Sequence, residues 1–196
     1  MIAVQILCYA SLGIFLIVSV MKIIKVARMP VHLRWELYPV PHEKGRASYG
    51  GSKLEEYGWW DKEHKNDNFN ELKEMGSEIL FLKAVWEFNR SLWIGTFPFH
   101  FGLYMLITNM GLLFMAGLMK LNGFNITAGS GGVTEILYYL ITSIAWTASI
   151  IGVFGAIRLL SSRIVDRGLR NHSSLSHYFN IILIGTIYFT ALIWLI

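Results

Sequence analysis

The chain has 196 residues, of which 54% are hydrophobic and 15% charged, with a formal net charge of +4. A soluble domain usually carries about 25% charged residues, so this composition excludes a soluble enzyme with one compact core, and equally a disordered or collagen-like chain. The basic excess does not indicate nucleic-acid binding, because the lysines and arginines lie beside apolar segments, as membrane topology requires.

The acidic residues are concentrated in one part of the chain. Eleven of the 13 aspartates and glutamates lie between Glu36 and Glu87, and only Glu135 and Asp166 lie elsewhere. The single cysteine, Cys8, excludes a disulfide framework, a covalent Cys-x-x-Cys-His haem site and an iron–sulfur cluster held by thiolates of this chain. The sequence therefore divides into one polar segment and several apolar ones.

Four apolar runs approach or exceed the roughly 20 residues that cross a hydrocarbon core as a helix. They predict an all-α transmembrane helical bundle with four spans in this chain. The predicted organisation is a first span over residues 1–24, a cytoplasmic insert over 25–91, a second span over 92–119, a third span over 133–160, a basic cytoplasmic loop over 161–178 and a fourth span over 179–196. The first run has neither a basic start nor a cleavage signature, so we expect a retained anchor and not a secretory signal.

The basic residues predict the orientation. Of the 17 lysines and arginines, 12 lie between Lys22 and Arg90 and four between Arg158 and Arg170, whereas the connection between the second and third spans has only Lys120. Because positive residues near span ends stay in the cytoplasm, we expect the N-terminus outside and the insert inside. The outer connection is rich in glycine, and its composition predicts a flexible loop.

The insert has two predicted parts. Three prolines between Pro30 and Pro41 favour an extended, turn-rich path. Apolar residues then recur at steps of three and four from Leu72 to Trp86, which predicts one amphipathic helix running into the second span, with Lys83 and Glu87 as an i,i+4 pair. Two interpretations stay open: a helix packed on its own loop or on the lipid interface, or a docking surface for a soluble partner.

One histidine, His100, lies inside a predicted span, whereas the other five lie in cytoplasmic segments or at a membrane edge. An ionisable group in lipid is costly and therefore needs a reason. The functional interpretation is an axial ligand of a b-type haem, with Gly102 making room for the macrocycle and with Arg90 and Arg158 at the inner surface to meet its propionates. The structural interpretation is a histidine hydrogen-bonded to a neighbouring helix or backbone carbonyl.

Two segments carry a resemblance to a known family: Phe-His-Phe-Gly-Leu over 99–103, and the basic run Ile-Arg-Leu-Leu-Ser-Ser-Arg-Ile-Val-Asp-Arg-Gly-Leu-Arg over 157–170, which leads into Tyr-Phe-Asn at 178–180. With them the chain resembles the cytochrome b (gamma) subunit of respiratory nitrate reductase. It resembles still more closely the sulfite-reductase-associated and heterodisulfide-reductase-type membrane subunits. The resemblance covers the spans and the basic connection, and the insert contributes nothing to it.

The resemblance implies a quinone-reactive subunit of an oxidoreductase complex in the prokaryotic cytoplasmic membrane. Its one or two b haems would relay electrons between a menaquinone-type quinone and a cytoplasmic iron–sulfur subunit, in contact with other membrane subunits and the lipid bilayer. The alternative is a cofactor-free membrane anchor that recruits a soluble redox enzyme. A transporter is disfavoured, because no span carries a paired acid and base apart from its ends.

The resemblance also implies the ligands. In the family, the second span carries two haem-ligating histidines ten residues apart, and their partners lie on a fifth span. His100 matches the first histidine, and Met110 stands at the second position, where it would serve only an outer haem. The fifth span is absent, so we expect either that the sequence continues beyond Ile196 or that His177, at the mouth of the fourth span, is the in-chain candidate for the second ligand, ahead of His172. Ligation by another subunit is the third alternative.

Overall fold

The computed structural model describes residues 2–29, 43, 57–63 and 65–196, which form two units divided between Asp67 and Asn68. The proline-rich stretch between Pro30 and Pro41 lies outside the described residues. The described residues are helical and contain no strand, only an isolated bridge between Glu43 and Asn66. The predicted all-α class is therefore confirmed.

The first unit contains α1, Ile2–Ala27, and the short 3-10 helix η2, Trp59–Asp61. α1 has no acidic residue in its first turn and carries the basic Lys25 in its last turn. Its segment Tyr9–Ala27 is long and apolar enough to cross a membrane. In η2, the rings of Trp59 and Trp60 pack edge to face with their centroids 6.0 Å apart.

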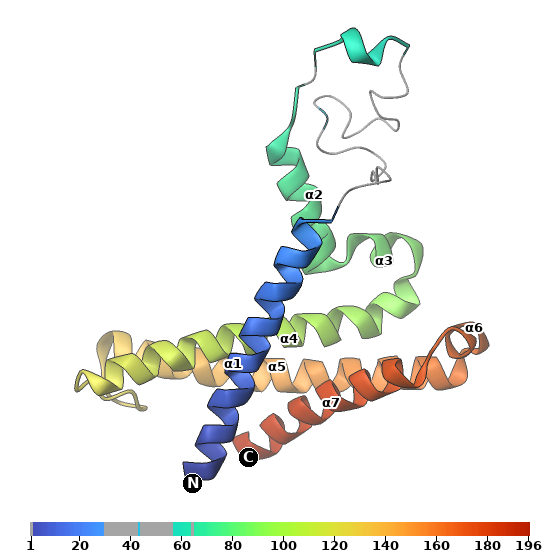
Figure 1. Cartoon of the computed structure of the whole chain (residues 1–196). Helices are drawn as coiled ribbons and strands as arrows, with labels where there is room; N and C mark the ends of the chain where they lie inside the picture. Colours follow the sequence, from blue (N-terminus) through green and yellow to red (C-terminus); the bar gives the residue numbers. More distant parts are fainter. Residues whose placement is uncertain (1, 30–42, 44–56, 64) are drawn as a thin grey trace. The chain divides into compact units, whose positions relative to one another are not determined.

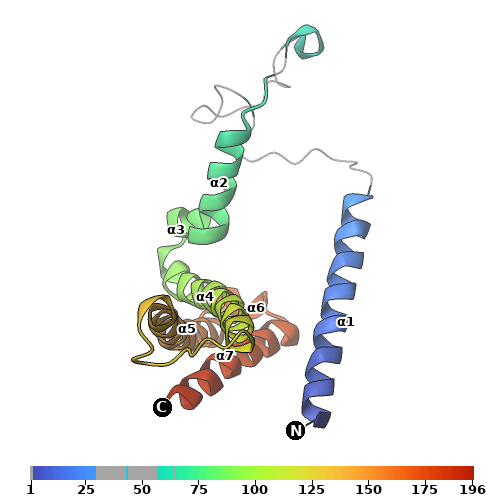
Figure 2. The same ribbon diagram turned by 90° about the vertical axis from the view of Figure 1, so that its left-hand side faces the viewer.

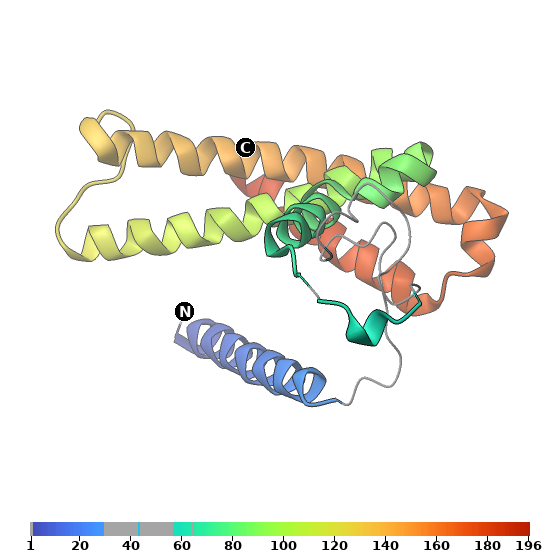
Figure 3. The ribbon, with the colours of Figure 1, turned by 90° about the horizontal axis from the view of Figure 1, so that it is seen from above.

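The second unit is built on three long helices: α4, Arg90–Leu121, α5, Gly132–Val165, and α7, Leu175–Leu195. α4 and α5 run antiparallel along one another, and α7 packs on α5 (Figure 1, Figure 3). Figure 2 looks along α4 and α5 and shows α7 beside them. All three helices are long and apolar enough to span a membrane, and with α1 they make the four predicted spans.

Small residues allow the three helices to approach closely. A Cβ on Gly155 of α5 would lie 2.4 Å from the backbone nitrogen of Phe99 in α4, and a Cβ on Gly152 would lie 2.5 Å from the ring of Tyr188 in α7. Around these contacts lies a small core of side chains from the three helices: Phe99, Ala156, Leu159, Ile181 and Tyr188. Close approach over small residues is how helices associate in lipid, where burial of apolar surface gives no driving force.

Most other apolar side chains of these helices face outward. At most 28% of the residues in the apolar segment of any one span are buried within the protein. A soluble bundle would bury a continuous apolar stripe on each helix, whereas a membrane bundle can leave such surface to lipid. The exposed apolar surface and the helix lengths together indicate a membrane protein.

The connection between α4 and α5, predicted from its composition to be flexible, makes specific hydrogen bonds in the structure. The two carboxylate oxygens of Glu135, in the first turn of α5, accept from the backbone N–H groups of Gly129 and Gly131 at 3.2 and 3.1 Å. Ser130 Oγ donates to the carbonyl oxygen of Thr127 at 2.9 Å. One of the two isolated acidic residues of the sequence therefore orders this loop.

At the other end of the bundle, the short helix α6, Arg167–Asn171, links α5 to α7. Asp166 caps α6 by accepting from the backbone N–H of Leu169 at 3.1 Å. α5 continues past the predicted end at residue 160 to Val165, and α7 begins at Leu175, before the predicted start at residue 179. The predicted basic loop is therefore largely helical.

The predicted single amphipathic helix is divided into α2, Asn68–Phe81, and α3, Lys83–Phe88, before α4 begins. Leu82 has a left-handed backbone with φ 53°, and Asn89 caps α4 by accepting from the backbone N–H of Leu92. Lys83 donates to Glu74 at 2.6 Å, so the predicted pairing with Glu87 is wrong. The spacing of apolar residues did not reveal the breaks at Leu82 and Asn89, because apolar side chains continue on both sides of each break.

Candidate functional site

His100 lies in α4, half-buried, two residues beyond Pro98. Its Nδ1 lies 2.8 Å from the carbonyl oxygen of Thr96, one turn earlier. A carbonyl oxygen can only accept, so the neutral ring carries its proton on Nδ1 and its lone pair on Nε2. Among the described residues, Nε2 makes no hydrogen bond. Metal-binding histidines generally have this arrangement, in which the other ring N–H is held by a backbone carbonyl or carboxylate.

His100 points away from the interface between α4 and α5. The buried residues of α4 are Gly95, Phe99, Gly102 and Asn109, which form one stripe facing α5. With 3.6 residues per turn, His100 lies about 140° around the helix from Gly95. We call this side of α4 the His100 face, defined by Trp93, Phe97, His100 and Tyr104.

The His100 face is rich in aromatic rings and carries the junction between α2 and α3. Trp93 stacks on Phe97 with their centroids 4.5 Å apart, and its indole Nε1 donates to the carbonyl oxygen of Phe81 at 2.8 Å. The hydroxyl of Tyr104 donates to the carbonyl oxygen of Ile79 at 2.9 Å. The end of α2 is therefore anchored to α4 on both sides of His100 along the helix.

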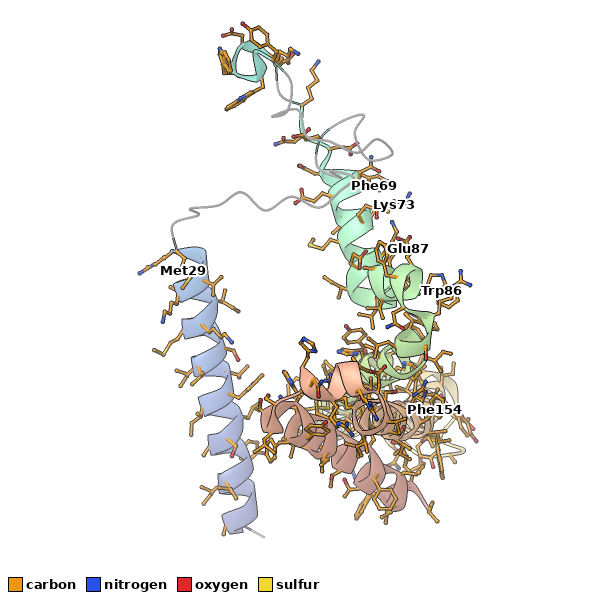
Figure 4. All side chains as sticks on the ribbon, turned by 90° about the vertical axis from the view of Figure 1, so that its right-hand side faces the viewer. Met29, Phe69, Lys73, Trp86, Glu87 and Phe154 are labelled. Atoms are coloured by element: carbon orange, nitrogen blue, oxygen red, sulfur yellow. The ribbon has the colours of Figure 1, made fainter. Side chains whose placement is uncertain are left out.

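The α3 helix extends this contact. The rings of Trp86 and Trp93 pack edge to face, 4.7 Å between centroids, and the guanidinium of Arg90 lies 4.8 Å from the centroid of Trp86. Figure 4 shows Trp86 and Glu87 projecting from α3, and Phe69 and Lys73 from the beginning of α2. Arg90 thus contacts an aromatic ring near the N-terminal end of the His100 face.

The structure does not bring Gly102 or Arg158 to the His100 face. A Cβ on Gly102 would lie 3.0 Å from the carbonyl oxygen of Ala148 and 3.1 Å from the Cα of Gly152, so the space beside this glycine is filled by α5. The side chain of Arg158 crosses Gly95 on the same α5-facing side. Its guanidinium donates to the hydroxyls of Ser162 and, at 3.2 Å, Ser91.

The two other predicted ligands are also distant from His100. Met110 is 65% exposed, and ten helical residues place it about 15 Å along α4. His177 caps its own helix, because its Nδ1 accepts from the backbone N–H of Ser174 at 3.1 Å. Tyr188 reaches the residue next to His100, and eleven residues of α7 separate it from His177, roughly 16 Å. His100 and His177 of one chain therefore cannot hold the same iron.

Sequence reasoning missed two polar residues inside the spans. The hydroxyl of Tyr188, fully buried, donates to the carbonyl oxygen of Phe99 at 2.6 Å. Asn109 is buried on α4, and within the described part of the chain its Oδ1 has no hydrogen-bond partner. Both could have been singled out from the sequence, because a polar group within a predicted span is costly in lipid whether it is a tyrosine, an asparagine or a histidine.

Within the described ranges, no cluster of three or more histidine, cysteine, aspartate or glutamate side chains could hold a metal ion. A haem needs fewer ligands from the protein, one or two axial side chains, so this finding concerns bare metal sites. No family of known proteins, no curated protein sequence and no solved structure matches this chain. The function has to be argued from the His100 face.

Proposed function

We propose that the protein is the membrane cytochrome b subunit of a respiratory electron-transfer complex. The observation that carries the proposal is the imidazole of His100, which lies within a span, has its proton held by Thr96 and has a free Nε2 lone pair. An imidazole that binds iron has to be neutral, with one nitrogen unprotonated. The sequence resemblance to nitrate reductase gamma-type subunits supports the same assignment.

The chain fits a haem on one side only. His100 would supply one axial nitrogen, and the aromatic rings of Trp93 and Phe97 would line the macrocycle on the His100 face. The second axial ligand would come from outside the described residues, since His177 is too far along α7. Arg90, at the N-terminal end of this face, remains a candidate for a propionate, whereas Arg158 faces α5. Haem iron would supply one-electron transfer, and the residues of the chain would position it and exclude water.

The junction of α2 and α3, anchored on α4, supports the proposal that a soluble partner subunit docks on the side of the bundle that carries His100. It joins the polar insert to the His100 face through Trp93 and Tyr104. A soluble iron–sulfur subunit that docks on the insert would therefore lie near the ligand. The quinone would approach from the bilayer, and with the positive-inside prediction the insert and this partner would lie in the cytoplasm of a prokaryote.

The test is haem content. We expect the complex, purified with its partners, to show a dithionite-reducible b-type absorption and a pyridine haemochrome. His100→Ala should abolish the haem that it ligates without affecting membrane insertion. The matched control is His172→Ala, because Nδ1 of His172 lies 2.9 Å from the carbonyl oxygen of Gly168, the same local bond, at an exposed position just after α6 and outside the spans. Unchanged haem content in His100→Ala would contradict the ligand assignment.

A cofactor-free membrane anchor is the second candidate. The observation that favours it is the position of Gly102 and of the Arg158 side chain on the α5-facing side of α4, away from the His100 face. In that case His100 is a structural histidine bound to its own helix. The anchor predicts a colourless complex that contains the chain and its soluble partner at full occupancy.

A further inference from the structure

A polar cavity of about 310 Å³ lies at one end of the bundle, where the beginning of α4, the end of α5 and α6 meet. We call it the Arg158 pocket. Its polar lining consists of Asn89, Ser91, Arg158, Ser161, Ser162 and Asp166. At roughly 30 Å³ for each water, it has room for about ten water molecules, and so for a phosphate group with part of its hydration.

The guanidinium of Arg158 is the centre of this pocket. It donates to the hydroxyls of Ser162 and Ser91, which uses two of its five N–H groups. Among the described residues, Arg158 forms no ion pair with a carboxylate. A cation bound only by neutral hydroxyls keeps its charge available for an anion.

The charge around the pocket also favours an anion. Asp166 is the one acidic lining residue, and one of its oxygens is occupied in capping α6. Residues 158–170 carry four arginines and this single carboxylate. The hydroxyls of Ser161 and Ser162 already donate to backbone carbonyl oxygens of α5, whereas the hydroxyl of Ser91 donates to no described group. A free hydroxyl donor beside a guanidinium suits a phosphate oxygen.

The position of Arg158 in the span indicates where the anion comes from. On α5 it is the first charged residue after Glu135, and the 23 helical steps from Glu135 to Arg158 span roughly 34 Å, slightly more than the hydrocarbon core. Arg158 therefore lies where the phosphates of a bilayer lie. Basic pockets at this level between membrane helices bind anionic lipid headgroups.

We propose that the Arg158 pocket binds the phosphate of an anionic phospholipid headgroup. The guanidinium of Arg158 bonds the phosphate oxygens, and the hydroxyl of Ser91 donates to the same group. The bound lipid holds together the start of α4 and the end of α5, and the site does not depend on whether the protein carries haem.

The test measures lipid retention. The purified protein is reconstituted in nanodiscs of phosphatidylcholine with one tenth phosphatidylglycerol and then extracted into detergent, and the bound phospholipid is measured by native mass spectrometry. We expect about one retained phosphatidylglycerol per chain, and a roughly tenfold loss in Arg158→Gln, the effect of about one charge-assisted bond. Ser91→Ala, which leaves the packing of Arg158 on Gly95 intact, should lower retention by about threefold.

Arg167→Gln is the matched control, because it removes the same charge from an exposed position in the same segment that does not line the pocket. It should retain the lipid like the wild type. An equal loss in Arg167→Gln, or wild-type retention in Arg158→Gln and Ser91→Ala, would overturn the proposal. Inorganic phosphate at 50-fold excess should not displace the lipid, and efficient displacement would assign the site to a soluble phosphate.

Discussion

At the scale of single residues, the bundle depends on glycines that stand where another helix needs their space. Gly155 is the tightest of them, because a Cβ there would lie 2.4 and 2.7 Å from the backbone nitrogen and Cα of Phe99. Backbone atoms cannot yield as the end of a flexible side chain can. Seven residues separate Gly95 from Gly102 on α4, which places both on the side that meets α5.

We therefore predict that Gly155→Ala destabilises the bundle by about 1–3 kcal/mol, the usual cost of overpacking. The measurement is the free energy of unfolding of the detergent-solubilised protein. Gly111→Ala is the matched control, since a Cβ at Gly111 meets nothing within 4 Å. It should not destabilise the bundle, because alanine favours a helix more than glycine does. Equal losses in the two variants would contradict the packing explanation.

Tyr188 provides the second prediction at this scale. Its hydroxyl is the polar link between α7 and the α4 backbone, and Tyr188→Phe removes that hydroxyl while keeping the ring that packs on Gly152. Hydrogen bonds between membrane helices average about 0.6 kcal/mol and reach about 1.7 kcal/mol. We expect a loss within this range by the same unfolding measurement, and no loss in Tyr139→Phe, where the side chain is 55% exposed.

At the scale of elements, the region between the insert and α4 differs most from the sequence prediction. The period of three and four residues correctly indicated helix from Leu72 to Trp86, but periodicity does not detect a single left-handed residue such as Leu82. The break has its own stabilising contacts: Glu78 accepts from the backbone N–H of Ala84 at 3.1 Å, and Glu74 pairs with Lys83 across the turn. Both carboxylates lie on α2, so the fold of α3 depends on α2.

The Lys83 ammonium should titrate abnormally. Its hydrogen bond to Glu74 raises the pKa of Lys83 above the ordinary value of 10.5. A raised pKa means that the pair contributes stability fully below pH 10.5 and loses it as the pH rises through the folded-state pKa. NMR titration of the lysine side chain should show the raised pKa, and Glu74→Gln should lower it. Glu87→Gln is the control and should lower it less, because Glu87 acts only through a weaker charge interaction.

The two isolated acidic residues illustrate what sequence reasoning could not supply. Glu135 binds two backbone N–H groups of the loop before α5, and Asp166 caps α6. Each role depends on where a helix begins within one or two residues, and hydropathy defines such boundaries least well. The spans themselves were predictable, because length and hydrophobicity suffice to define them.

At the scale of the whole molecule, composition already indicated membrane helices, and the four apolar helices confirm this. The candidate site was only partly predictable. His100 stands out in the sequence because a histidine in lipid has a high free-energy cost. The structure adds the hydrogen bond between its Nδ1 and the carbonyl oxygen of Thr96. The faces occupied by Gly102 and Arg158 depend on which side of α4 meets α5, and this follows from packing that the sequence alone does not specify.

The topology provides a prediction for the intact membrane. In a Cys8→Ser background, Ala128→Cys in the connection between α4 and α5 should react with a membrane-impermeant maleimide in intact cells, because the distribution of basic residues predicts that this connection faces outward. Asn171→Cys, at the end of α6, should react only after lysis. Both positions are exposed, so access is not limited by burial. The reverse labelling pattern would invert the orientation.

The hydrogen bond from Tyr188 to Phe99 also affects its neighbour. The carbonyl immediately before His100 is fixed by α7, and the imidazole itself is fixed by Thr96. A ligand that binds Nε2 therefore meets a ring that has already lost most of its rotational freedom, and binding costs little further entropy. The packing of α7 on α4 should therefore affect the affinity of His100 for a ligand. A change that weakens this packing should weaken ligand binding at Nε2, even when every residue that contacts the ligand is unchanged.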